Sequence, residues 1–156
     1  MESKLMVEQV FSCINSIIER YAGSKNRAGV VKRFRARARS LPQEVFSRGL
    51  AYTLVYIAAR SSRDAVERGL EEKITECRDV VNSVGELADK TNMGEEELSY
   101  ALYGAVILYL AKRLGIVKLN RLESIVCEAL NNVVLEVKMW PVIDWLKRVA
   151  EAYISE

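Results

Sequence analysis

The fold is decided by one stretch of sequence, residues 95–115, which reads EEELSYALYGAVILYLAKRLG. Its apolar part, Tyr100–Ala111, is 12 residues long, whereas a helix that spans a membrane needs about 20 residues. We therefore expect a helix buried in a protein core. The glutamates at 95–97 complement the positive end of a helix dipole and Gly115 is a typical C-terminal signal, so the predicted helix covers 95–114.

Further helices are predicted on both sides of this stretch. Hydrophobic residues recur with a 3.6-residue period almost everywhere, and no segment alternates with a period of two. The predicted ranges are 2–21, 28–40, 42–60, 62–91, 119–137 and 142–153. Pro42 and Pro141 set two of the boundaries, because proline disfavours a continuous helix. The expected fold is all-α, a single-domain bundle of six or seven helices over residues 1–156.

The composition removes most kinds of catalysis. The chain has no histidine, the commonest general base and metal ligand near neutral pH. It also lacks a glycine-rich phosphate-binding loop and a nucleophile elbow. We expect a protein that is not an enzyme, with no catalytic residues, no metal, no cofactor and no small-molecule substrate.

The three cysteines, Cys13, Cys77 and Cys127, lie too far apart in sequence for the spacing of a zinc site. Each falls in an apolar helical pattern, so all three are predicted to be reduced thiols in the core of an intracellular protein. No signal peptide and no membrane span is found, which predicts a cytoplasmic protein without a membrane partner.

The charge distribution singles out one segment. The formal net charge is only +2, yet no acidic residue occurs between Glu19 and Glu44. This interval holds eight basic residues: Arg20, Lys25, Arg27, Lys32, Arg33, Arg35, Arg37 and Arg39. Such a run makes a local positive field that the overall balance hides.

Five of these residues share the predicted helix 28–40. At about 100° per residue, Lys32, Arg33, Arg35, Arg37 and Arg39 spread over an arc of roughly 200°, and the apolar residues form a narrow stripe opposite. Three interpretations are open: a solvated face paired with acids of other helices, a docking surface for an acidic protein, or a surface that follows a nucleic-acid backbone. A helix-turn-helix regulator is disfavoured, because the range 42–60 is too apolar for a recognition helix.

Two segments resemble a known family. They are residues 34–60, FRARARSLPQEVFSRGLAYTLVYIAAR, and residues 145–152, WLKRVAEA. Both are similar to the small all-helical subunit of the Cmr complex, the type III-B CRISPR effector. The sequence departs from the family pattern at Arg48, where an amide side chain is typical, and at Val149, where an aromatic is common. Of the apolar residues, we expect Leu41, Leu50, Trp145 and Leu146 in the core, and Trp140 either there or as an exposed anchor for a neighbouring subunit.

The resemblance implies a subunit that is not itself a nuclease. Its copies would stack as a short filament, with basic faces lining the channel for target RNA, and its partners would be other CRISPR effector subunits and the backbone of guide RNA and target RNA. The family's basic positions correspond here to Arg35, Arg39, Arg60, Lys147 and Arg148. With the basic arc, the predicted nucleic-acid-binding residues are Lys32, Arg33, Arg35, Arg37, Arg39, Arg60, Lys147 and Arg148. The alternative is a helical protein–protein scaffold or a DNA-binding regulator outside CRISPR.

Overall fold

The computed structural model describes residues 2–155, which form eight α-helices and a single 3-10 helix and contain no strand. The elements are α1 (Glu2–Tyr21), α2 (Gly29–Arg48), α3 (Leu50–Arg60), α4 (Arg63–Glu67), η1 (Arg68–Leu70), α5 (Cys77–Lys90), α6 (Glu95–Arg113), α7 (Leu122–Asn131) and α8 (Val133–Tyr153). The predicted all-α bundle is confirmed, with eight helices in this range instead of six or seven.

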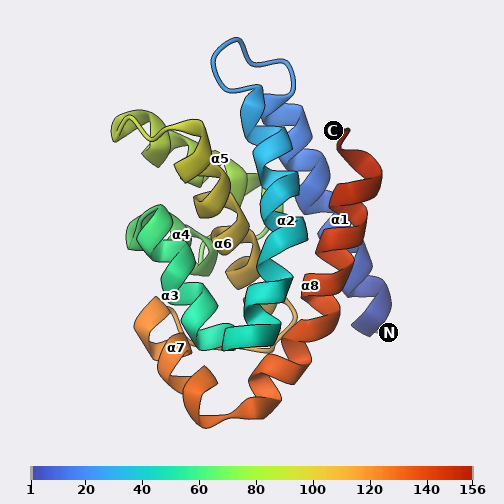
Figure 1. Cartoon of the computed structure of the whole chain (residues 1–156), viewed down its shortest axis with the longest axis vertical. Helices are drawn as coiled ribbons and strands as arrows, with labels where there is room; N and C mark the ends of the chain where they lie inside the picture. The colour runs from blue at the N-terminus through green and yellow to red at the C-terminus, as the bar shows by residue number, and fades with distance from the viewer. Residues whose placement is uncertain (1, 156) are drawn as a thin grey trace.

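The centre of the molecule is α6. Every residue from Leu98 to Ala111 on this helix is buried, and α2, α3, α4, α5 and η1 all pack directly against it. Figure 1 shows α6 enclosed by α2, α5 and α4, with α3 and α7 at the end opposite the loop between α1 and α2. The core helix predicted from the sequence is therefore confirmed. Within residues 2–155, no helix combines the length and apolar character needed to cross a membrane.

The long helices α1, α2 and α8 pack against one another beside this centre, as Figure 1 shows. The C-terminal end of α8 therefore lies along α2, although the two helices are distant in sequence. This neighbourhood matters for the site, because α2 carries most of the predicted basic residues and α8 carries Lys147 and Arg148.

Both helix boundaries predicted at proline are wrong. Pro42 lies inside α2 and Pro141 lies inside α8. The chain breaks instead at Gly49, whose φ of 91° favours glycine, and at Asn132, whose side chain accepts a hydrogen bond from the N–H of Val134. In both helices buried residues continue at helical spacing past the proline, so tertiary packing outweighs the lost backbone hydrogen bond.

The long helix predicted over 62–91 is also wrong, because the chain forms α4, η1, a loop and then α5. The predicted start is correct: Ser62 accepts a hydrogen bond from the N–H of Ala65 at 3.0 Å. The chain leaves the helical conformation at Glu71, directly after η1. Within η1, Gly69 packs closely on α6, since a Cβ there would lie only 2.0 Å from the carbonyl oxygen of Ala105. With this break, α4, η1 and α5 each pack against α6. A single straight helix over 62–91 would be too long to stay in contact with α6 along its whole length.

The cysteine prediction is half right for each residue: Cys13 and Cys77 lie in the core but are oxidised, and Cys127 is a free thiol but is exposed. Cys13 on α1 and Cys77 on α5 form a disulfide, and both are completely buried. Their Cα atoms are 5.1 Å apart although 64 positions separate them in sequence, a distance within the disulfide range. The third cysteine, Cys127, is an exposed free thiol. Packing of α1 against α5 creates the pair, and sequence spacing gave no sign of it.

The residues Leu41, Leu50 and Leu146 are buried, as predicted. The prediction that Trp145 lies in the core is wrong, because this residue is 41% exposed. Trp140 packs against the core while remaining partly accessible. Its ring centroid lies 5.9 Å from that of Phe46, which is 75% exposed. Trp140 of α8 thus packs between the core and the exposed ring of Phe46 on α2.

Candidate nucleic-acid interface

The basic residues of α2 flank a buried stripe formed by Val31, Phe34, Ala38, Leu41 and Val45. Lys32, Arg33 and Arg39 are exposed, and Arg35 and Arg37 are half-buried. This is the arrangement that the helical spacing predicts. The five residues nevertheless do not form one continuous site, because their side chains reach different neighbours.

One group gathers at the side where α2 meets α3 and α6. Nη1 of Arg37 lies 3.9 Å from Oε1 of Glu96, and Nη2 of Arg60 lies 3.1 Å from the same oxygen. Both guanidinium groups also lie over the ring of Tyr100, at 4.5 Å for Arg37 and 5.1 Å for Arg60. These distances suit cation–π attraction. We call Arg37, Arg60, Glu96 and Tyr100 the arginine pair cluster.

A second group gathers where α2 meets α8. Nε of Arg39 lies 3.2 Å from Oε2 of Glu151, and Nη1 of Arg148 lies 3.3 Å from Oε1 of the same carboxylate. Arg148 also contacts Asp144 at 3.8 Å. Arg35 stands one helical turn before Arg39 on the same side of α2. The structure thus brings Arg148 of α8 next to Arg39 of the basic helix.

The counter-charges come from helices distant in sequence. Glu96 and Glu151 each neutralise two arginines, and Asp89 pairs with Arg27 at 3.4 Å. Within residues 2–155, no ion pair reaches Lys32, Arg33 or Lys147. Arg33 nevertheless lines a pocket with Glu95, Glu96 and Glu97 of α6, so acidic side chains lie close to it.

Ion pairs on this surface are weak and exchangeable. The side chains of Arg39 and Arg60 are about half exposed, as is that of Glu96. Exposed pairs contribute only about 0–1 kcal/mol each, because water and salt compete for both partners. An incoming phosphate can therefore replace a carboxylate partner at modest cost, and the pairs do not by themselves exclude nucleic-acid binding.

Sequence reasoning placed the basic residues but missed Glu96, Glu151 and Tyr100. The glutamates at 95–97 were explained by the helix dipole, and Tyr100 was counted only as a core residue. No local signal identifies these partners, because each belongs to a helix that meets α2 only in the folded chain.

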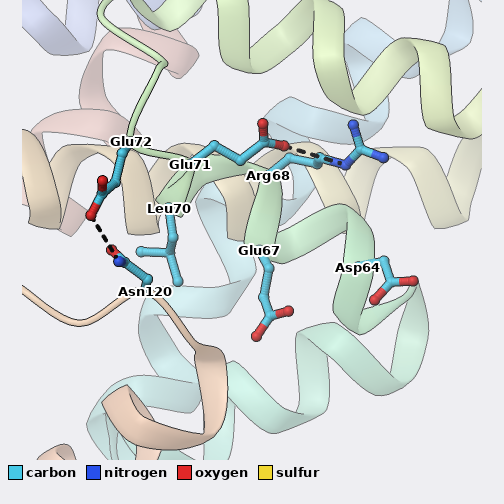
Figure 2. A pocket seen from close by; sticks show the side chains of 7 residues that line it. All are labelled: Asp64, Glu67, Arg68, Leu70, Glu71, Glu72 and Asn120. Atoms are coloured by element: carbon cyan, nitrogen blue, oxygen red, sulfur yellow. Dashed lines mark hydrogen bonds and ion pairs between the residues drawn. The ribbon is translucent and has the colours of Figure 1, made fainter.

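A separate cavity of about 460 Å³ has the opposite charge (Figure 2). It lies beside α4 and η1 and is lined by Asp64, Glu67, Arg68, Leu70, Glu71, Glu72 and Asn120. Its carboxylates have structural roles: Glu67 accepts a hydrogen bond from the N–H of Leu122 at 2.7 Å, and Glu72 accepts one from Asn120 at 3.0 Å. Among the described residues, no group of acids or cysteines could hold a metal ion. The cavity offers nothing for a phosphate.

Most of the exposed large hydrophobic residues belong to α2, α3, α7 and α8. Figure 1 shows the junction of α2 with α3, helix α7 and the start of α8 together at the bottom of the molecule. We call the following residues the apolar end patch: Phe46 of α2, Tyr52 and Val55 of α3, Leu130 of α7, and Val133, Val134 and Val137 of α8. Phe46, Leu130 and Val133 are at least 70% exposed. Exposed hydrophobic residues that lie together are typical of a protein–protein contact.

Comparisons with known proteins give a family match and a structural match. The family model described as CRISPR-associated protein (Cas_Cmr5) matches residues 3–153. Among solved structures, the fold is similar to a chain in the cryo-EM structure of the type III-B Cmr-beta complex bound to non-cognate target RNA. The TM-score is 0.64 at 20% sequence identity, and the match covers 96% of this chain and 94% of that one. A search among curated proteins finds no match.

Proposed function

Since the chain belongs to the Cas_Cmr5 family of CRISPR-associated proteins, we propose that it is a non-catalytic small subunit of a type III-B CRISPR effector complex. The family match over residues 3–153 carries this proposal. The similar fold of a chain from a type III-B complex bound to target RNA supports it. The complex would use guide RNA against invading RNA, and this subunit would contribute binding surfaces only.

In this role the basic surface lines the channel for target RNA. Lys32, Arg33, Arg35, Arg37 and Arg39 of α2 contact phosphates, joined by Arg60, Lys147 and Arg148. Arginine suits this task because its planar fork binds phosphate through two hydrogen bonds. The one aromatic side chain among the α2 basic residues, Phe34, is buried. Binding is therefore electrostatic and tolerant of RNA sequence.

Self-association of the subunit raises its affinity for RNA above that of a single copy. The apolar end patch gives each copy a surface for a neighbour, which supports a filament of stacked subunits. Weak phosphate contacts repeated along such a filament raise the overall affinity without any new contact.

RNA binding is tested by fluorescence anisotropy with two unrelated labelled single-stranded RNAs over a range of salt. If about four phosphates are contacted, the log–log salt slope is near −3 for a single strand. The variant R35E/R39E should lose binding to both RNAs. The control K118E/R121E makes the same charge change at two exposed residues between α6 and α7, and should bind more like wild type.

The competing function is a protein scaffold whose basic face docks an acidic subunit. It is favoured by the observation that Arg37, Arg39, Arg60 and Arg148 already pair with carboxylates. A reconstituted complex distinguishes the two functions. If a complex containing R35E/R39E forms and binds target RNA normally, the basic face does not line the channel. If the complex fails to form, the scaffold function is supported.

The filament is tested with Phe46→Asp, which places a charge in the apolar end patch. Because Phe46 is 75% exposed, the isolated chain should still fold, which circular dichroism checks. Mass measurement of reconstituted complexes should show fewer copies of the variant. Leu119→Asp, at a 39% exposed residue outside the patch, should assemble normally. Full assembly of Phe46→Asp would exclude the patch as the contact between copies.

A further inference from the structure

The arginine pair cluster holds two cations around a single acceptor atom. Oε1 of Glu96 lies 3.1 Å from Arg60 and 3.9 Å from Arg37. The two guanidinium groups come from α2 and α3, and the ring of Tyr100 holds both of them. Two like charges brought together in this way attract an anion between them. The position of the Glu96 oxygen therefore marks where an oxygen of another anion would bind.

The members of this cluster differ in how firmly they are held. Tyr100 is 6% exposed and the Arg37 side chain 19%, whereas the Glu96 side chain is 53% exposed. The platform of Tyr100 and Arg37 is thus fixed by packing, and Glu96 is the member that faces solvent. A carboxylate on an exposed first turn of α6 can swing away without disturbing the core.

The neighbouring glutamates on α6 point elsewhere. The Glu95 carboxylate lies against the start of α2, where a Cβ on Gly29 would be 2.7 Å from Oε2. Glu97 lies toward Gly94, with its Oε1 3.7 Å from the position that a Cβ on Gly94 would take. These two suit the positive ends of α2 and α6. Glu96 is the one of the three that pairs with the arginines.

We infer that Arg37 and Arg60 form one phosphate-binding site, and that the Glu96 carboxylate occupies this site in the free protein. The ligand is a phosphodiester group of single-stranded RNA, which displaces Glu96 and takes its place between the two guanidinium groups. Glu96 thereby lowers the RNA affinity of the isolated subunit. The inference rests on the proposed RNA-binding function and adds to it an internal competitor at a defined position.

The test compares Glu96→Gln with Glu97→Gln in the anisotropy assay with single-stranded RNA. Both substitutions remove one negative charge from the exposed first turn of α6, so their effects on the general field are matched. Removing a competitor worth about one exposed ion pair should tighten binding by about two- to five-fold for Glu96→Gln. Glu97→Gln should change affinity much less.

A further variant tests whether the effect of Glu96→Gln on RNA affinity depends on Arg37 and Arg60. The variant R37Q/R60Q lacks the proposed phosphate site. Adding Glu96→Gln to it should leave RNA affinity unchanged, because Glu96 and RNA no longer compete for a common site. Thermal unfolding by circular dichroism confirms that each variant is folded.

The outcomes separate this inference from the proposed function. Equal gains from Glu96→Gln and Glu97→Gln would show a general charge effect and overturn the site. Wild-type RNA binding that is lost in R35E/R39E but unchanged by Glu96→Gln overturns the site and leaves the proposed function standing. Absence of RNA binding by the wild type, by Glu96→Gln and by the reconstituted complex overturns both.

Discussion

Glu136 on α8 caps α3 from another part of the chain. Its Oε1 accepts a hydrogen bond from the N–H of Leu50, the first residue of α3, at 2.6 Å. The residue before Leu50 is Gly49, which has no side chain to cap the helix. The Glu136 carboxylate therefore satisfies a backbone N–H at the start of α3 and ties the junction of α2 and α3 to α8.

Removing this cap should destabilise the fold. Glu136→Ala should lower the free energy of unfolding by about 1–2 kcal/mol, the usual contribution of a helix cap. Urea unfolding followed by circular dichroism measures the change. The control Glu86→Ala alters an exposed glutamate of α5 with no ion pair or hydrogen bond among the described residues and should stay within about 0.5 kcal/mol of wild type. Equal effects of the two variants would contradict the cap.

Gly69 should tolerate no side chain. A Cβ there would meet the backbone of Ala105 at 2.0 Å, so Gly69→Ala must push η1 away from α6. We expect a loss of about 1–3 kcal/mol or more in the free energy of unfolding. Gly23→Ala is the matched control, because no atom lies within 4 Å of its Cβ position. A neutral or slightly stabilising Gly23→Ala beside a destabilising Gly69→Ala would confirm the close approach.

The Cys13–Cys77 disulfide determines how many cysteines a thiol reagent can label. A thiol reagent should label one cysteine, Cys127, in the native or denatured unreduced chain, and all three after reduction. Replacing both Cys13 and Cys77 by alanine should cost about 4 kcal/mol, from the chain-entropy relation for a loop of 64 residues. Thermal unfolding with and without reductant checks the size. Three labelled thiols in the denatured unreduced chain would mean that the disulfide is not formed.

Tyr103 should make the fold sensitive to alkali. Burial raises the pKa of its phenol above the ordinary value of 10.0, so above about pH 10 the unfolded chain loses this proton while the folded chain retains it. Stability is then fully present below pH 10 and falls as the pH rises, by at most about 1.4 kcal/mol per pH unit for one group. Tyr103→Phe should remove this part of the decline. Denaturant unfolding at pH 7, 10 and 11 measures it.

The same variant reports on an unpaired hydroxyl. Among the described residues the Tyr103 hydroxyl has no hydrogen-bond partner, and an unsatisfied buried polar group costs about 1–3 kcal/mol. Tyr103→Phe should therefore match or exceed wild-type stability at pH 7. A clear loss at pH 7 would show that the hydroxyl is satisfied in solution.

Much of the fold could be predicted from hydrophobic periodicity, because that pattern is local. The boundaries of α1 and the core role of α6 followed from it directly. The predictions at Pro42 and Pro141 failed because a local rule about proline was outweighed by buried stripes that continue past each residue. The loop before α5 was missed because the hydrophobic periodicity continues across it, whereas the chain leaves the helical conformation at Glu71.

The basic surface was predictable in outline for the same reason. Angles along one helix place Arg33 and Arg37 on one side of the buried stripe and Arg35 and Arg39 on the other. The separate partners of Arg37 and Arg39 agree with this division. Which acid neutralises which arginine depends on tertiary packing of α6 and α8 against α2. The Cys13–Cys77 pair was unpredictable on the same grounds.

The enclosure of α6 has a consequence for the dynamics of the whole chain. The central part of α6, where every residue from Leu98 to Ala111 is buried, cannot open to water until the neighbouring helices separate. Backbone amide hydrogens between Leu98 and Ala111 should therefore exchange with solvent only through global unfolding, and their exchange rates report the total stability of the chain. The amides at the exposed ends of α7 and α8 should exchange faster, through local fraying.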